Sequence, residues 1–189
     1  MNRKIIPVLL LSVLFSCNRS YTPKPMGYPR IDFPDKNYTL YDVGGPYSFE
    51  IPTYAYVEEN KRGSREPWWI NIVYPELNGK IHISYKSLEG NLEAYIEDSR
   101  TLVYKHTSQS DGIEETPFFD EEERRFGILY DLKGDVASSV QFFVTDSSSH
   151  FLRGSLYFNT QTNRDSLNPV IDFLREDILH LIESITWKQ

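Results

Sequence analysis

Histidine is the side chain best suited to acid–base catalysis or metal binding near neutral pH. The chain has four histidines: His82, His106, His150 and His180. They fall on different predicted elements, and no two have the spacing of a metal-binding or nucleophile motif such as HExxH or GxSxG. We therefore expect no metal, no cofactor and no catalytic residue, and predict that the protein is not an enzyme.

His106 is the histidine with the most open interpretation, because it ends the apolar stripe of a predicted helix. In one interpretation the ring bonds to the last helical carbonyls and complements the helix dipole. In another, His106 groups with Glu114 and Glu115, which are near in sequence, as a patch that docks a partner. A third possibility is that His106 supports hydrolysis together with Glu114 or Glu115.

Three further residues are candidates for interaction. Arg153 lies in a predicted strand and either pairs with a carboxylate of the sheet or belongs to a site, while Gly154 next to it indicates a bulge or the close approach of another backbone. Trp68 and Trp69 form an aromatic pair that, with neighbouring tyrosines, could stack against sugars. The alternative function is therefore a cell-wall glycan-binding lipoprotein.

Cys17 is the only cysteine, and the residues before it indicate why it is there. Arg3 and Lys4 are followed by an apolar stretch over Ile5–Phe15, which is the layout of a secretory signal and too short to span a bilayer. Leu14–Cys17 resembles the lipobox of bacterial lipoproteins. In such proteins the signal peptide is cleaved off directly before the cysteine, and the cysteine is acylated. We predict a signal peptide over residues 1–16 and lipidation of Cys17.

Composition and charge restrict the remaining function classes. The net charge is −7, with no basic cluster, which disfavours binding to nucleic acid. Prolines are frequent from residue 23 to 52, so this part cannot form a continuous helix. We expect a lipidated proline-rich tether and N-terminal arm over residues 17–45, with an edge strand within residues 30–41, and a single domain over residues 46–189.

Alternation of apolar and polar residues predicts β-strands over much of this domain. Strands are expected over residues 47–51, 54–57, 68–74 and 80–86, with Asn78-Gly79 as the turn of a hairpin between the last two. A second series is expected over residues 113–118, 126–132, 136–145 and 151–159. The turns Lys133–Asp135 and Asp146–Ser149 join the last three of these strands into a predicted meander, and the strands should be antiparallel neighbours.

Two segments have the period of an amphipathic helix. One covers residues 92–106, with Asn91 as the expected cap, and the other begins at Asn168-Pro169 and carries a continuous apolar stripe to Ile185. The stripe must be buried on a sheet or a helix. The fold class is therefore α+β, with one antiparallel β-sheet flanked by helices, and the order of elements resembles the Mog1/PsbP-like sandwich, a mostly non-catalytic fold.

Several longer segments together resemble the gliding-motility lipoprotein GldD family of Bacteroidota. They are Lys24–Pro34, Glu97–His106, Ala137–Phe143 and His150–Asn159. The resemblance implies an envelope lipoprotein required for gliding and for the type IX secretion apparatus, with a protein partner that is another lipoprotein of this machine. It implies no catalytic residue.

The predicted location follows from the residues after the lipidated cysteine. Asn18–Tyr21 contain no acidic cluster, whereas surface-exposed lipoproteins of this phylum typically carry an acidic export signal there. We expect a lipid-anchored protein of the cell envelope that faces the periplasm, at the inner leaflet of the outer membrane.

Overall fold

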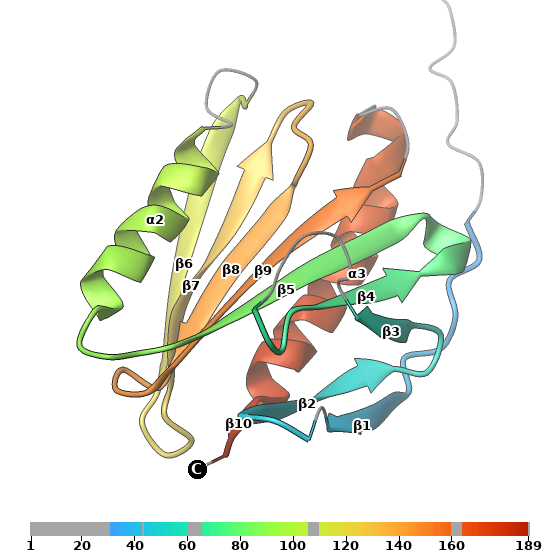
Figure 1. Cartoon of the computed structure of the whole chain (residues 1–189). Helices are drawn as coiled ribbons and strands as arrows, with labels where there is room; N and C mark the ends of the chain where they lie inside the picture. The colour runs from blue at the N-terminus through green and yellow to red at the C-terminus, as the bar shows by residue number, and fades with distance from the viewer. Residues whose placement is uncertain (1–30, 43, 60–65, 106–109, 160–163, 189) are drawn as a thin grey trace, which may run out of the picture. The chain divides into compact units, whose positions relative to one another are not determined.

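The computed structural model describes residues 31–42, 44–59, 66–105, 110–159 and 164–188. Contacts divide the chain into two units, Met1–Ile31 and Asp32–Gln189, and every described helix and strand belongs to the second unit (Figure 1). Cys17 and His106 lie outside the described residues.

The larger of two sheets has seven antiparallel strands. In chain order they are β3 (Tyr56–Glu59), β4 (Ile70–Tyr74), β5 (Gly79–Ser87), β6 (Gly112–Asp120), β7 (Arg125–Lys133), β8 (Val140–Thr145) and β9 (His150–Phe158). In space the order is β3-β4-β5-β9-β8-β7-β6. The predicted meander is confirmed, because β6, β7, β8 and β9 pair in sequence.

The predicted hairpin is also confirmed, but its turn is longer than expected. Strands β4 and β5 pair from Tyr74 opposite Gly79 onward. The connection is a 3-10 turn, η2 (Pro75–Leu77), followed by Asn78 in the left-handed conformation at φ 50°. Gly79 is thus the first residue of β5 rather than part of the turn, and a Cβ atom there would lie 2.8 Å from Leu174.

A second, three-stranded sheet has the order β1-β2-β10, whereas the sequence predicted one sheet. Its strands are β1 (Tyr38–Asp42), β2 (Tyr47–Pro52) and β10 (Thr186–Trp187). The edge strand predicted within residues 30–41 corresponds to β1, which pairs with β2. Strand β10 consists of two residues near the C-terminus that pair with β2, a contact between distant positions that no local pattern reveals.

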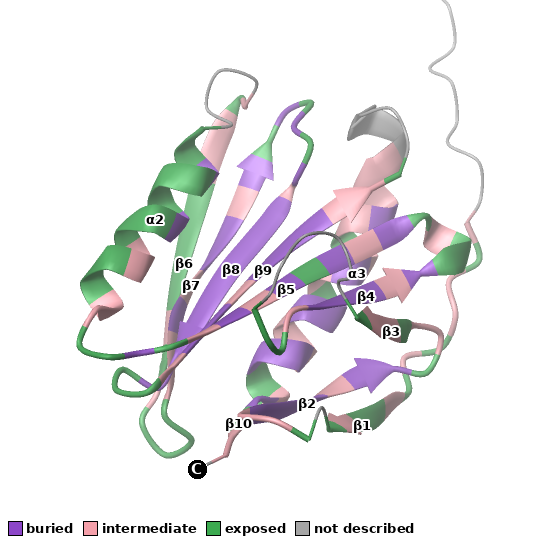
Figure 2. Cartoon of the chain, viewed as in Figure 1, coloured by how far each residue is buried: buried purple, intermediate pink, exposed green. Residues whose placement is uncertain are grey.

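The two described α-helices, α2 (Leu92–Tyr104) and α3 (Arg164–Ser184), cover opposite faces of the seven-stranded sheet (Figures 1 and 2). Val103 of α2 packs in a cluster with Tyr130 and Phe143, which lie on one face. On the other face, Asp131 of β7 pairs with Arg175 of α3. Successive strand residues thus serve two cores, as the pleat requires, and the predicted α+β class is confirmed.

The apolar stripe of α3 is buried as predicted, but the helix begins earlier. Its buried members are Val170, Leu174, Ile178, Leu181 and Ile182. The helix starts at Arg164 rather than at the predicted Asn168, so that Pro169 lies inside it. Proline removes one hydrogen bond to the carbonyl four residues earlier, a loss that burial of the stripe offsets.

Two smaller predictions need correction. Asn91 does precede α2, but its side chain makes no capping bond and instead accepts a hydrogen bond from the Glu89 amide. Gly154 forms no bulge, because β9 pairs through it without interruption, opposite Ile83 and Phe142. The neighbour that requires a glycine is the Phe142 ring, 2.2 Å from where a Cβ would lie, rather than another backbone.

Candidate functional site

The candidate site is a row of polar side chains that crosses the seven-stranded sheet. Residues directly opposite each other in an antiparallel sheet project from the same face, and register pairs connect one residue of every strand in this row. From the β3 edge to the β6 edge, the polar row consists of Glu58, Asn71, His82, Ser155, Gln141, Tyr130 and Glu115. An unbroken polar row forgoes the apolar burial that stabilises a sheet face, which points to a role in recognition.

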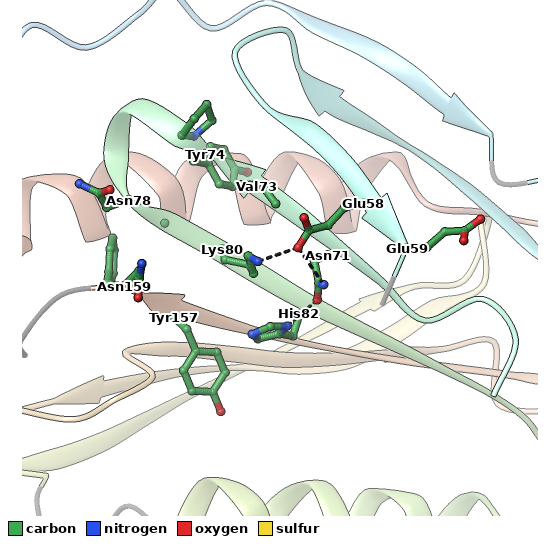
Figure 3. Close-up of a pocket in the computed structure, with 13 residues that line it drawn as sticks. Glu58, Glu59, Asn71, Val73, Tyr74, Asn78, Lys80, His82, Tyr157 and Asn159 are labelled. Carbon is green, nitrogen blue, oxygen red and sulfur yellow. Dashed lines mark hydrogen bonds and ion pairs between the residues drawn. The ribbon is translucent and has the colours of Figure 1, made fainter. Parts of the chain in front are cut away.

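The β3 end of the row is a bonded chain (Figure 3). Glu58 accepts hydrogen bonds from Lys80 Nζ at 2.6 Å and from Asn71 Nδ2 at 3.3 Å. Because a carboxylate only accepts, the amide nitrogen of Asn71 faces Glu58 and its oxygen faces His82 Nδ1. His82 Nδ1 is therefore the donor. Partial burial, together with the Lys80 ammonium, lowers the pKa of His82, and the neutral ring leaves Nε2 as an acceptor.

A groove of about 1170 Å³ lies over this end of the row. Its lining includes Val73, Lys80, His82, Tyr157 and Asn159, from β4, β5, β9 and the residue after β9 (Figure 3). Helix α2 packs over β8 and β9 and does not line the groove. Of the α-helices that the structure describes, neither covers this half of the sheet face.

The middle of the row is buried and incompletely bonded. Tyr130 and Gln141 are 1% exposed and Ser155 is 2% exposed. The hydroxyls of Tyr130 and Ser155 and the amide nitrogen of Gln141 have no hydrogen-bond partner in the structure. A buried polar group left without any partner costs about 1–3 kcal/mol, so three such neighbours in one row favour a bound water or ligand at this place.

Arg153 lies beside this part of the row. The sequence left open whether it pairs with a carboxylate of the sheet or belongs to a site. Arg153 donates from Nη2 to Gln141 Oε1 at 2.6 Å, and it forms no ion pair with any described carboxylate. Desolvation lowers its pKa, opposed by the nearby Tyr157 and Tyr130. Arg153 is therefore a half-buried cation without a counter-charge in the part of the chain described, and not the structural ion pair of the first interpretation.

At the β6 end, Glu114 and Glu115 project from opposite faces of the sheet, because they are adjacent in one strand. Glu115 accepts a hydrogen bond from the Tyr104 hydroxyl at 2.7 Å and ends the polar row. Glu114 pairs with Lys133 at 3.2 Å on the α3 side. One surface patch can therefore contain only one of these carboxylates together with His106, whose position is not described.

Both predicted aromatic candidates have roles within the fold. Trp68 has a positive φ of 67°, and its ring lies over Gly45, where a Cβ would come within 2.5 Å. Trp69 donates from Nε1 to the Tyr85 carbonyl at 3.0 Å, and Lys86 lies over its ring. These contacts account for both side chains without a sugar, and glycan binding stays a prediction.

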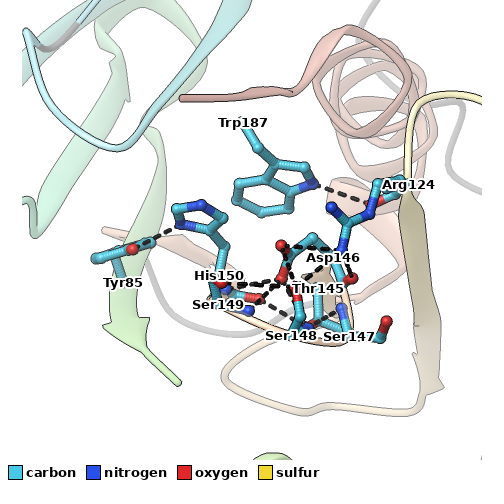
Figure 4. A network of polar contacts seen from close by, with 9 residues as sticks. All are labelled: Tyr85, Arg124, Thr145, Asp146, Ser147, Ser148, Ser149, His150 and Trp187. Carbon is cyan, nitrogen blue, oxygen red and sulfur yellow. Dashed lines mark hydrogen bonds and ion pairs between the residues drawn. The ribbon is translucent and has the colours of Figure 1, made fainter. Parts of the chain in front are cut away.

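A second polar network ties the C-terminal strand to two turns of the large sheet (Figure 4). Asp146 accepts from the backbone amides of Ser148, Ser149 and His150. Burial raises the pKa of Asp146, but these amides outweigh it and the net shift is downward. The indole of Trp187 stacks on His150, with ring centroids 5.2 Å apart.

The members of this network satisfy one another and do not form a nucleophile–base pair. His150 Nδ1 bonds to the Tyr85 hydroxyl at 2.8 Å, and Trp187 Nε1 donates to the carbonyl of Arg124. Arg124 itself donates to the Asp146 carbonyl. The arrangement positions the last residues of the chain against the turns between β6 and β7 and between β8 and β9.

Because of this network, stability should fall as the pH is lowered from 7.5 to 5.5. Burial lowers the pKa of His150. The Asp146 carboxylate opposes this shift, and the Arg124 guanidinium adds to it. A histidine of the unfolded chain has a pKa near 6.5, so at lower pH the unfolded chain binds more protons than the folded chain. The contribution of neutral His150 to the unfolding free energy is therefore complete above about pH 6.5 and is lost as the pH falls through the lower folded pKa. His150→Phe, which can keep the stack on Trp187, should show a smaller decrease in the unfolding free energy, measured in urea at both pH values. An equal decrease in both proteins would contradict this assignment.

Neither metal chemistry nor a membrane span has support in the described residues. Among them, no group of three or more His, Cys, Asp or Glu side chains is placed to hold a metal ion. Of the helices that the structure describes, none has the length and apolar character needed to cross a bilayer. The polar row, its groove and the adjacent Arg153 offer hydrogen-bond donors, hydrogen-bond acceptors and a cation without a counter-charge among the described residues. These are the groups that a binding site for a polar ligand requires.

Sequence reasoning found Arg153 and Glu115 but missed the row to which they belong. Its local signal is the polar set Lys80, His82 and Ser84, which alternates with the apolar residues of β5. The partner strands of β5 come from distant parts of the chain, so His82 meets Ser155 only through the register of β5 with β9. That register is a tertiary property.

Comparison with known proteins gives one family match. A family model described as "Gliding motility lipoprotein GldD" matches residues 18–187. No curated protein matches the chain. Among solved structures, the chain is similar to the solution structure of cyanobacterial PsbP (CyanoP) from Synechocystis sp. PCC 6803, with 10% sequence identity and a TM-score of 0.47, over 87% of this chain and 100% of that one.

Proposed function

Because the chain belongs to the GldD family of gliding motility lipoproteins, we propose that it is a non-enzymatic assembly component of the gliding and type IX secretion machinery. It acts by contact with other proteins of this machinery, among them another lipoprotein that it stabilises. The observation that carries the proposal is the extent of the family match, which covers residues 18–187.

The proposed anchor is the acylated Cys17. Two or more acyl chains hold a protein stably on a membrane, since each buried CH₂ contributes about 0.8 kcal/mol and a single chain gives only reversible binding. The absence of acidic residues from Asn18–Tyr21 favours a position facing the periplasm, at the inner leaflet of the outer membrane. Confinement at that surface raises the local concentration of partners, so that a weak contact is well occupied.

The proposed contact surface is the open half of the sheet face, with the groove and the polar row. Its neutral and charged hydrogen-bonding groups, such as Asn71, Lys80 and His82, resemble the polar composition of interfaces that form and dissociate. Helix α3 packs on the opposite face of the sheet, and neither described α-helix lines the groove, which is why we choose the groove face.

Site-specific crosslinking in cells tests this proposal. A photo-crosslinking residue at Val73, which lines the groove, should capture another component of the gliding machinery, identified by mass spectrometry. The matched control is the same residue at Asp172, an exposed position of α3, which should not capture it. Equal capture from both positions would reject the groove face, and no gliding component from either would reject function by protein contact.

A further inference from the structure

Three buried polar groups in the middle of the sheet face have no hydrogen-bond partner among the described residues, namely the amide nitrogen of Gln141 and the hydroxyls of Tyr130 and Ser155. Beside them lies the half-buried guanidinium of Arg153, which donates to Gln141 Oε1. Ser155 and Tyr130 are both directly opposite Gln141 in the register of β8 with its neighbours. Arg153 is two residues before Ser155 on β9 and so projects from the same face.

What these groups share is that they can all donate a hydrogen bond. An arginine side chain has five N–H donors, and the only hydrogen bond that the Arg153 side chain makes to a described residue goes to Gln141 Oε1. The hydroxyls and the amide nitrogen each add an unused donor. A site with one positive charge and several donors complements a group with negative charge and several acceptor lone pairs.

The charge around these donors selects a monoanion over a dianion. Glu58, at one end of the polar row, is paired with Lys80. Glu115, at the other end, has no ion pair among the described residues, and the chain as a whole has a net charge of −7. Both oppose the entry of a doubly charged phosphate. A carboxylate carries a single charge and fits the planar fork of a guanidinium with two parallel hydrogen bonds.

We propose that Arg153, Gln141, Ser155 and Tyr130 form a carboxylate-binding site, occupied by an acidic side chain or the C-terminal carboxylate of a partner protein. The choice of a protein carboxylate rests on the proposed function by protein contact. The site itself does not depend on that choice, since a small free carboxylate offers the same atoms.

Access to the site runs from the groove. His82 lines the groove and is directly opposite Ser155, and Tyr157, which also lines it, lies within electrostatic reach of Arg153. His82 is exposed, and Arg153 and Tyr157 are half-buried. Rotamer changes of such side chains take picoseconds to nanoseconds, so the proposed path to Ser155 and Gln141 needs side-chain rotation and no unfolding of the sheet.

The competing occupant is buried water, which commonly satisfies isolated polar groups in protein interiors. Water and a carboxylate make different predictions. Bound water would make the site insensitive to carboxylates in solution. A carboxylate site should respond to them in proportion to their concentration, because a ligand that binds only the folded state raises its stability.

The test measures the thermal unfolding temperature of the full-length chain in detergent, at pH 7.5, in sodium acetate and in sodium chloride of equal ionic strength. The original chain should show a saturable rise in acetate relative to chloride, and Arg153→Gln should lose it. The matched control is Arg175→Gln, since Arg175 already has a bidentate carboxylate partner in Asp131. It should keep the acetate-dependent rise, which separates site binding from a general salt effect.

A second variant protects the test against failure of Arg153→Gln to fold. Tyr130→Phe combined with Ser155→Ala removes two donors that have no partner, at little change in shape. This variant should unfold at a higher temperature than the original chain in chloride, and its rise in acetate should be smaller. Two results would reject the proposed site. One is no acetate response in the original chain, and the other is the same response in the original chain and in these variants.

Crosslinking then identifies the source of the carboxylate. If the ligand belongs to a protein, Arg153→Gln should reduce the capture of the gliding component from the groove position Val73 several-fold. If capture is unchanged while the acetate response is lost, the site stands and its ligand is a small free carboxylate. The acetate measurement tests the site alone. Capture by the chain that retains Arg153 tests the proposed function. Either proposal can therefore fail without the other.

Discussion

Replacing Cys17 with alanine is expected to remove the lipid anchor and abolish gliding, while the unfolding free energy of the domain stays unchanged. The proposed lipid anchor is attached at Cys17, and no other cysteine in the chain could take its place. The described domain begins only at the second unit, Asp32–Gln189, so the substitution lies outside its core. Mass spectrometry of the N-terminal peptide measures the modification directly, and motility assays measure the consequence.

This experiment needs a second variant, because Cys17→Ala also removes the cleavage site and can leave the apolar segment Ile5–Phe15 attached. In the second variant, residues 1–17 are replaced by a secretory signal that is cleaved before Asn18. The product should be soluble and fail to restore gliding. The control is Ser20→Ala, which leaves Leu14–Cys17 intact and should be lipidated and active. Full gliding with the soluble product would show that the anchor is dispensable.

Local sequence patterns predicted the elements whose conformation depends mainly on residues that are near in sequence. The meander follows from alternating residues and from turns such as Lys133–Asp135, in which Gly134 has a φ of 104°. The stripe of α3 follows from its period, and five of its residues are buried, as is Ile185 directly after the helix. Helix starts were less predictable, because Asn168-Pro169 has the composition of a cap although the helix already begins at Arg164.

The candidate site depended on information that the sequence holds only indirectly. Arg153 could be selected from its unusual place in a strand, but the absence of a carboxylate beside it depends on which side chains β5 and β8 bring to the same face. The unpaired groups of Tyr130, Gln141 and Ser155 require hydrogen-bond geometry to be recognised. Residue type alone gave no reason to single them out.

Removal of the Asp177 side chain should be the most destabilising single change in the described domain that leaves the apolar core intact. Asp177 is a fully buried carboxylate of α3 that accepts hydrogen bonds from Lys36 Nζ at 2.8 Å, from Tyr38 at 2.9 Å and from Tyr54 at 2.7 Å. Burial and the bonds to Asp177 raise the pKa of both tyrosines. The carboxylate thus joins the N-terminal arm, the segment between β2 and β3, and α3.

The expected loss for Asp177→Ala is about 3–5 kcal/mol of unfolding free energy, because it leaves the Lys36 ammonium, whose side chain is 23% exposed, without its buried partner. Glu176→Ala is a matched control on the same helix. Glu176 also pairs with Lys36, at 3.3 Å, but its side chain is 67% exposed, so its loss should cost less than about 1 kcal/mol. Urea unfolding of the three proteins measures both values, and similar losses in the two variants would show that Asp177 is not the main attachment point.

The same variant should also change how far the domain reaches from the membrane. Phe33 stacks on Phe173 and Tyr38 on His180, so the arm is held along α3 by rings as well as by Asp177. A fully extended chain from Cys17 to Asp32 spans at most about 50 Å, and release of the arm as far as β1 would add roughly 20 Å. Protease cleavage between Phe33 and Tyr38 in otherwise folded Asp177→Ala protein should therefore be faster than in Glu176→Ala. Equal cleavage would mean that the rings alone hold the arm, and that the carboxylate stabilises the domain without setting the length of its tether.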